Sequence, residues 1–119
     1  MDRLQTVDGS NWEEFIRLPQ AVLVLAKSDC PHCKAWGEEL AAGLEDVDFW
    51  PGVRFGKMVL DSRGLTSFKR ANPWLAEVDV LPFNVIYVQG ERVKTFAGGG
   101  LQRLDGRLRQ LSQGTASSE

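Results

Sequence analysis

Two cysteines separated by two residues, Cys30 and Cys33, are the side chains of this sequence best suited to chemistry. They follow the apolar run 21–26 and stand at the start of a helical pattern. Across the first turn of a helix, such a pair has its Cα atoms roughly 5 to 6 Å apart, which a disulfide tolerates. The two thiols can therefore form and open a disulfide without moving the backbone, and the spacing predicts a redox-active pair.

A metal site and an inert crosslink are the alternatives to redox chemistry. A structural zinc site needs four protein ligands, whereas this sequence offers two cysteines and a single histidine, His32, between them. No metal site is therefore predicted for a single chain. A static disulfide remains the other alternative, although closing so short a loop removes little entropy from the unfolded chain.

Length and composition limit the class of protein. The chain has 119 residues, 43% hydrophobic and 25% charged, which suits one ordinary globular domain. We place that domain at 1–111 and expect a flexible polar tail at 112–119. The net charge of −2 comes without a basic stripe, so neither nucleic acid nor a membrane is predicted as a partner. No apolar run approaches the roughly 20 residues that span a bilayer.

The first eight residues lack the basic start, apolar stretch and cleavage site of a secretory signal, so a cytoplasmic location is expected. A chain whose signal has been removed would begin in the same way. The periplasm or secretion is therefore the alternative, and two cysteines suit either compartment.

The segments around the cysteines alternate between strand and helix patterns. The unbroken apolar run 21–26 indicates a strand buried on both faces of a sheet. From Pro31, apolar residues that recur every three or four positions indicate one face of a helix, and a second buried strand is expected at 53–60. Because the connection between these strands has the length of a βαβ crossover, the middle of the sheet is predicted to be parallel.

The remaining elements follow from the same patterns and from turn residues. They are expected at 4–7 (strand), 10–18 (helix), 62–79 (two short helical pieces, the second capped by Asn72), 82–88 and 92–97 (an antiparallel hairpin) and 101–111 (helix).

The order of these elements resembles the thioredoxin superfamily over about residues 4–111. The specific matches are the Cys30 and Cys33 pair after a buried strand, Pro82 before the hairpin and Gly98 beyond it. The resemblance implies an α/β thioredoxin-like fold, with a central mixed β-sheet flanked by helices. It also implies a thiol-disulfide oxidoreductase in which Cys30 attacks first and Cys33 acts second.

No metal or organic cofactor is implied, because the two cysteines are their own redox centre. The implied substrates are protein or small-molecule thiols and disulfides, and a reductase or a thiol partner must reset the pair. A monomer is expected. The rival class is a non-enzymatic interaction module or redox sensor of the same fold, whose reversible disulfide controls partner binding.

The dipeptide between the cysteines, Pro31 and His32, is similar to that of DsbA-type oxidases and differs from the Gly-Pro pair of thioredoxins. An imidazole near the first sulfur and the amide groups of the helix N-terminus both stabilise the Cys30 thiolate, which makes the disulfide easier to reduce. The carboxylate of Asp29 opposes this effect. The alternative is that His32 is an exposed side chain without consequence.

In the superfamily, the proline that matches Pro82 has a cis peptide bond and lies beside the disulfide. The backbone of the preceding residue, here Leu81, pairs there with an extended substrate segment. Both residues are therefore expected to bind substrate, and a trans proline at a strand entrance is the alternative. Val24 stands where thioredoxins bury an acid that relays a proton for the second cysteine, so slow resolution by Cys33 is expected.

Overall fold

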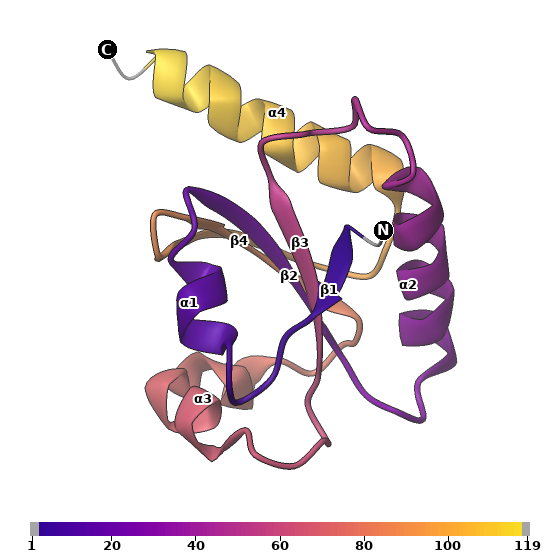
Figure 1. Cartoon of the computed structure of the whole chain (residues 1–119), viewed down its shortest axis with the longest axis vertical. Coiled ribbons are helices and arrows are strands. Elements are labelled where there is room, and N and C mark those ends of the chain that lie inside the picture. The colour runs from indigo at the N-terminus through magenta and orange to yellow at the C-terminus, as the bar shows by residue number, and fades with distance from the viewer. Residues whose placement is uncertain (1–2, 118–119) are drawn as a thin grey trace.

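Five strands form one mixed β-sheet in the computed structural model, which describes residues 3–117, with side chains to residue 111. In spatial order they are β1 (Leu4–Thr6), β3 (Arg54–Val59), β2 (Gln20–Ala26), β4 (Phe83–Val88) and β5 (Glu91–Ala97). The first three strands are parallel to one another, whereas β4 and β5 form an antiparallel hairpin beside β2 (Figure 1). The predicted mixed sheet with a parallel middle is confirmed.

Strand β2 is the centre of the sheet, between β3 and β4. Every residue from Ala21 to Ala26 is buried, because helices cover both faces of the strand. This explains the unbroken apolar run in the sequence, since a strand with one solvated face would alternate with polar residues. The strand ends at Ala26 and leads directly to the two cysteines.

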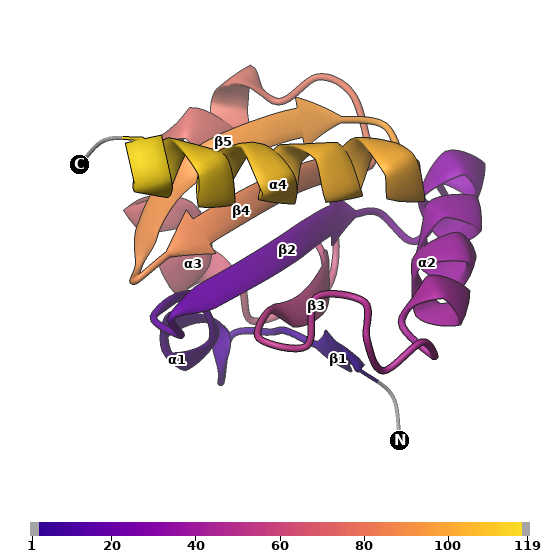
Figure 2. The ribbon, with the colours of Figure 1, turned by 90° about the horizontal axis from the view of Figure 1, so that it is seen from above.

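Helix α2 (Pro31–Gly43) and helix α4 (Leu101–Ser117) cover one face of the sheet. Helix α1 (Trp12–Ile16) and helix α3 (Thr66–Ala71) cover the other. Figure 1 shows α4 above the sheet and α1 and α3 below it, and Figure 2 shows α4 crossing the strands. None of the described helices is both long and apolar enough to cross a membrane.

The side chains beneath α2 and α4 form what we call the α2/α4 cluster. Its buried members are Val22, Val24, Trp36, Leu40, Leu44, Val53, Phe55, Ile86, Phe96, Leu104 and Leu108. Because this cluster lies directly below the helix that carries the cysteines, it holds that helix against the sheet.

Two helix ends and one helix type differ from the predictions. Helix α1 ends at Ile16, because a residue before proline, here Leu18, disfavours helical backbone. The second piece of 62–79 is a 3₁₀ helix, η1 (Pro73–Glu77). Asn72 is its N-cap residue and Pro73 lies in its first turn, as predicted, but the Asn72 side chain donates to the Phe68 carbonyl and makes no capping hydrogen bond.

The last helix also differs, because α4 continues beyond residue 111 into the expected tail. Polar residues can extend a helix without burying a face, since each turn satisfies its own backbone hydrogen bonds. The flexibility expected of 112–119 stays a prediction, and residues 118 and 119 lie outside the described residues.

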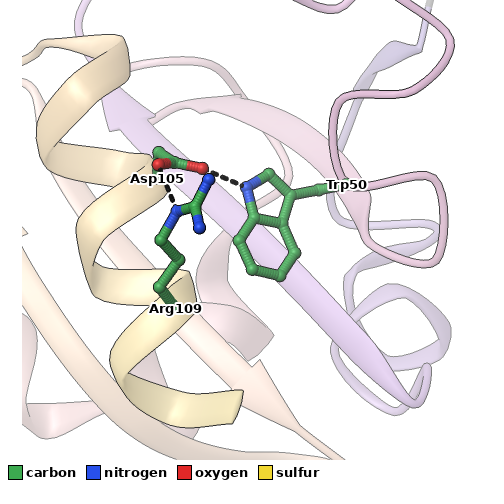
Figure 3. Close-up of polar contacts among 3 residues, drawn as sticks. All are labelled: Trp50, Asp105 and Arg109. Carbon is green, nitrogen blue, oxygen red and sulfur yellow. Dashed lines mark hydrogen bonds and ion pairs between the residues drawn. The ribbon is translucent and has the colours of Figure 1, made fainter. Parts of the chain in front are cut away.

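The connection between α2 and β3 is attached to α4 by a polar contact far from the cysteines. The indole Nε1 of Trp50 donates to Asp105 Oδ1 at 2.8 Å, and Arg109 Nε donates to Asp105 Oδ2 at 2.7 Å (Figure 3). The hydrogen bonds from Arg109 and Trp50 lower the pKa of Asp105 from its ordinary value.

Candidate redox site

The two cysteines form a disulfide at the turn from β2 into α2. Cys30 is the N-cap, with extended backbone, and Pro31 is the first helical residue, where a missing amide hydrogen is not needed. The Cα atoms of Cys30 and Cys33 are 5.2 Å apart, inside the predicted range. The Cys33 amide donates to Cys30 Sγ at 3.1 Å, and an amide in this place also stabilises a thiolate after reduction.

The two sulfurs differ in exposure. Cys33 is 1% exposed, whereas Cys30 is half-buried. Helix geometry explains the difference, because Cys33 lies on the face of α2 that packs on the sheet and Cys30 lies at its end. Only Cys30 is therefore open to a substrate sulfur.

Leu81 and Pro82 lie beside Cys30 although they are distant in the sequence. The carbonyl oxygen of Leu81 is 4.0 Å from Cys30 Sγ, and the peptide bond between Leu81 and Pro82 is cis, as predicted. Pro82 is buried, and its carbonyl accepts from the Gly98 amide at 2.8 Å. The structure therefore brings together the four residues that the sequence analysis assigned to chemistry and substrate binding.

A groove of about 340 Å³ runs beside the disulfide, with one wall on α2 and the other on the Leu81 to Pro82 segment and the bend after β5. The residues that line it include His32, Trp36, Leu81, Pro82, Gly98 and Gly99. The exposed His32 thus faces the same groove as Pro82, whereas Asp29 lies in the exposed loop before the cysteines. The effect of both charges on the Cys30 thiol stays a prediction.

A second, larger groove of about 800 Å³ lies on the other side of Leu81. Its apolar lining includes Leu60, Leu75 and Val78, and Lys27 and Lys69 stand among its charged residues. Leu81 lines both grooves, and its carbonyl oxygen is the atom 4.0 Å from Cys30 Sγ.

The loop before Cys30 is held to the end of β3. The backbone amide and the hydroxyl of Ser28 both donate to the Asp61 carboxylate, at 3.1 and 2.6 Å, and these hydrogen bonds lower the pKa of Asp61. This attachment fixes the approach of the chain to the disulfide.

One residue of the site was missed by the sequence analysis. Asn84 is 0% exposed, and its side chain accepts from Trp36 Nε1 at 2.8 Å. Its amide group donates to the carbonyls of Phe96 and Gly98, at 3.1 and 2.7 Å. The available signal was a lone asparagine within an apolar strand, which indicates a buried polar group with partners elsewhere in the fold.

Among the described residues, no group of three or more His, Cys, Asp or Glu side chains is placed to hold a metal ion. The chemistry that the site can perform by itself is thiol-disulfide exchange.

Neither a family model nor a curated protein matches this sequence. Solved structures do match. The thioredoxin Mala s 13 of Malassezia sympodialis has a TM-score of 0.72 at 16% identity, covering 92% of this chain and 91% of that one. Thioredoxin f2 of Chlamydomonas reinhardtii has a TM-score of 0.69 at 21% identity, covering 90% and 94%. The thioredoxin of Fasciola hepatica has a TM-score of 0.69 at 17% identity, covering 90% and 98%.

These similarities extend over almost the whole of each chain and confirm the α/β thioredoxin-like fold. The chain is therefore a thioredoxin-fold protein. Its particular form of the fold carries a Cys30–Cys33 disulfide with Pro31 and His32 between the cysteines, and Val24 buried in the sheet.

Proposed function

We propose that this protein is a thiol-disulfide oxidoreductase that exchanges disulfides with protein or small-molecule substrates. The observation that carries this proposal is the unequal pair of sulfurs at the start of α2. Cys30 is half-buried, with its sulfur 4.0 Å from the carbonyl of Leu81, which lines the groove, whereas Cys33 is 1% exposed. Unequal exposure supports a two-step exchange, in which the sulfurs act in order.

In the reductive direction, the Cys30 thiolate attacks one sulfur of a substrate disulfide. A bond forms between Cys30 Sγ and that sulfur, the substrate S–S bond breaks, and the other substrate sulfur leaves as a thiolate. The Cys33 thiolate then attacks Cys30 Sγ, and the second substrate thiolate leaves. The protein loses two electrons to the substrate as its disulfide closes, and the two protons released by its thiols pass through water to the substrate thiolates. The reverse steps oxidise a substrate dithiol.

A turnover assay separates an enzyme from a redox sensor of the same fold. An enzyme reduces many equivalents of insulin disulfide when dithiothreitol resets it, whereas a sensor reacts once and stops. We expect multiple turnovers, and none from Cys30→Ser. A single stoichiometric reaction of the wild-type protein would favour the sensor.

His32 is expected to stabilise the reduced protein, because it lies between the two cysteines in the first turn of α2, where an imidazole can favour the Cys30 thiolate. The variant His32→Pro should therefore lower the reduction potential, by about 30 mV if the exchange equilibrium changes tenfold. Equilibration with glutathione measures the shift. Asp29→Asn is the matched control, since removing the opposing carboxylate should raise the potential. An unchanged potential in His32→Pro would leave the helix N-terminus as the sole stabilising feature.

Pro82 is expected to affect substrate binding more than the reduction potential. Pro82 lines the groove, whereas the disulfide is held at the start of α2. In Pro82→Ala, kcat/KM for insulin should fall by about tenfold to a hundredfold, the cost of misplacing a bound segment. The reduction potential should change little. A potential shift with unchanged insulin kinetics would contradict the assigned role.

We also propose that another cellular component resets the disulfide after each reductive turnover. A reductase or a low-molecular-weight thiol would supply the electrons, as part of cell redox homeostasis. The cytoplasmic location and the monomeric state stay predictions, which cell fractionation and light scattering test directly.

A further inference from the structure

Asn84 is the one buried side chain with an amide or a charge among the described residues, and it lies on β4 at the centre of the fold. Both hydrogens of its amide group and its oxygen are used, in bonds to Phe96, Gly98 and Trp36. Burying an amide is costly unless its hydrogen bonds are made, and an apolar side chain of similar size would fill the same space. The three bonds must therefore serve something other than filling the core.

The partners of Asn84 belong to the two walls of the groove beside the disulfide. Trp36 lies on α2, less than one turn after Cys33, and forms part of the first wall. Gly98 lies in the bend after β5, forms part of the second wall, and donates its amide to the Pro82 carbonyl. One side chain thus links the cysteine helix to the segment that faces it.

Packing reinforces this link. A Cβ atom on Gly99 would lie 2.9 Å from the indole of Trp36, so the bend is already in close contact with the ring. Asn84 itself does not line the groove. Its influence on a bound substrate therefore passes through Trp36 and Gly98.

We propose that Asn84 is a positioning residue that sets the separation of the two groove walls and so favours extended protein segments as substrates. This inference rests on the proposed function. A protein segment must contact both walls at once, so its reaction depends on their separation. A small disulfide needs only the open Cys30 sulfur, so its reaction does not. Directional hydrogen bonds fix such a separation more strictly than apolar packing, which has no preferred direction.

The test compares two disulfides in single turnovers of the reduced protein. Insulin represents an extended protein segment, and hydroxyethyl disulfide represents a small substrate. The variant Asn84→Leu retains side-chain volume and removes all three hydrogen bonds. We expect its rate with insulin to fall by about tenfold or more, within the range that misplacement of a bound group produces. Its rate with hydroxyethyl disulfide should stay at the wild-type value.

A second variant and a matched control keep the test decisive if Asn84→Leu does not fold. Trp36→Phe removes the hydrogen bond between α2 and Asn84 and part of the ring that packs against Gly99, so it should lower the insulin rate in the same selective way. Trp50→Phe removes an indole hydrogen bond of the same 2.8 Å length, to Asp105, away from the groove. It should change neither rate.

Equal losses with both disulfides, or no loss with either, would overturn the proposal, because a purely structural role cannot discriminate between substrates. Single-turnover rates also separate this inference from the proposed function. A protein that fails to catalyse repeated insulin reduction would refute the enzyme assignment, yet its stoichiometric reaction would still report the selectivity of the groove.

Discussion

The variant Cys33→Ser is expected to stop turnover and to accumulate a covalent complex between Cys30 and its substrate. Cys30 is half-buried and is expected to form the mixed disulfide, whereas Cys33 is 1% exposed. Serine at position 33 cannot attack the Cys30 sulfur, so the second step is lost and the first remains. Non-reducing electrophoresis and mass spectrometry detect the complex, and turnover should fall below detection.

The reciprocal variant is the control for this experiment. Cys30→Ser should form no complex, because the buried Cys33 cannot reach a substrate sulfur in the folded protein. If Cys30→Ser trapped substrate and Cys33→Ser did not, the order of the two cysteines would be reversed.

The variant Val24→Asp is expected to change stability and rate in opposite senses. Val24 is 1% exposed in the α2/α4 cluster, and its neighbours in the sheet are Lys57 on β3 and Asn84 on β4. A carboxyl group there replaces apolar packing, so the free energy of unfolding should fall by about 3 kcal/mol. The same group can accept the proton of the Cys33 thiol, so resolution of the mixed disulfide should accelerate.

Lys57 is the charged group closest to an aspartate introduced at position 24, because it pairs with Val24 in the sheet. Its side chain runs beneath α2, with Nζ 3.3 Å from the position that a Cβ atom on Gly37 would occupy. The described structure shows no ion pair for Lys57. An ammonium group cannot take a proton, so Lys57 alone does not replace the missing acid, but it would favour ionisation of a carboxylate introduced beside it.

The pH dependence of Val24→Asp has a defined sign. Burial raises the pKa of the introduced carboxyl above its value in the unfolded chain. The stability deficit is then smallest below the unfolded value, where both states are protonated, and grows as the pH rises through the folded value. Urea midpoints of variant and wild type at acidic and neutral pH measure the difference.

Val22→Asp is the matched control for Val24→Asp. Val22 is buried on the same face of the same strand, two residues further from the cysteines. It should destabilise the fold by a similar amount without accelerating resolution in stopped-flow measurements. If Val24→Asp folds and resolves the mixed disulfide at the wild-type rate, water or another group already supplies the proton transfer.

Local chemistry made much of this fold predictable from the sequence. The run at 21–26 is apolar throughout, which suits only a strand covered on both faces. Gln89 and Gly90 form a two-residue turn in which both have positive φ, so the hairpin follows from the turn residues. The Cys30 and Cys33 spacing is itself a local property, because a helical turn sets the distance between them.

Contacts between segments distant in the sequence could not be predicted from local patterns. Leu81 reaches Cys30 across 51 residues, and only the resemblance to a known superfamily, not any periodicity, predicted that contact. The length of α4 was also missed, since its apolar stripe ends before the helix does.

By itself, the sequence determined the redox pair, the central strand and the hairpin, because each depends on residues close together in the chain. Only the tertiary structure decided that Asn84 joins Trp36 to Gly98 and that a groove lies between their segments. A lone asparagine in an apolar strand signals that a partner exists but not which one. That partner depends on how α2 and the bend after β5 pack on the sheet, which no local pattern specifies.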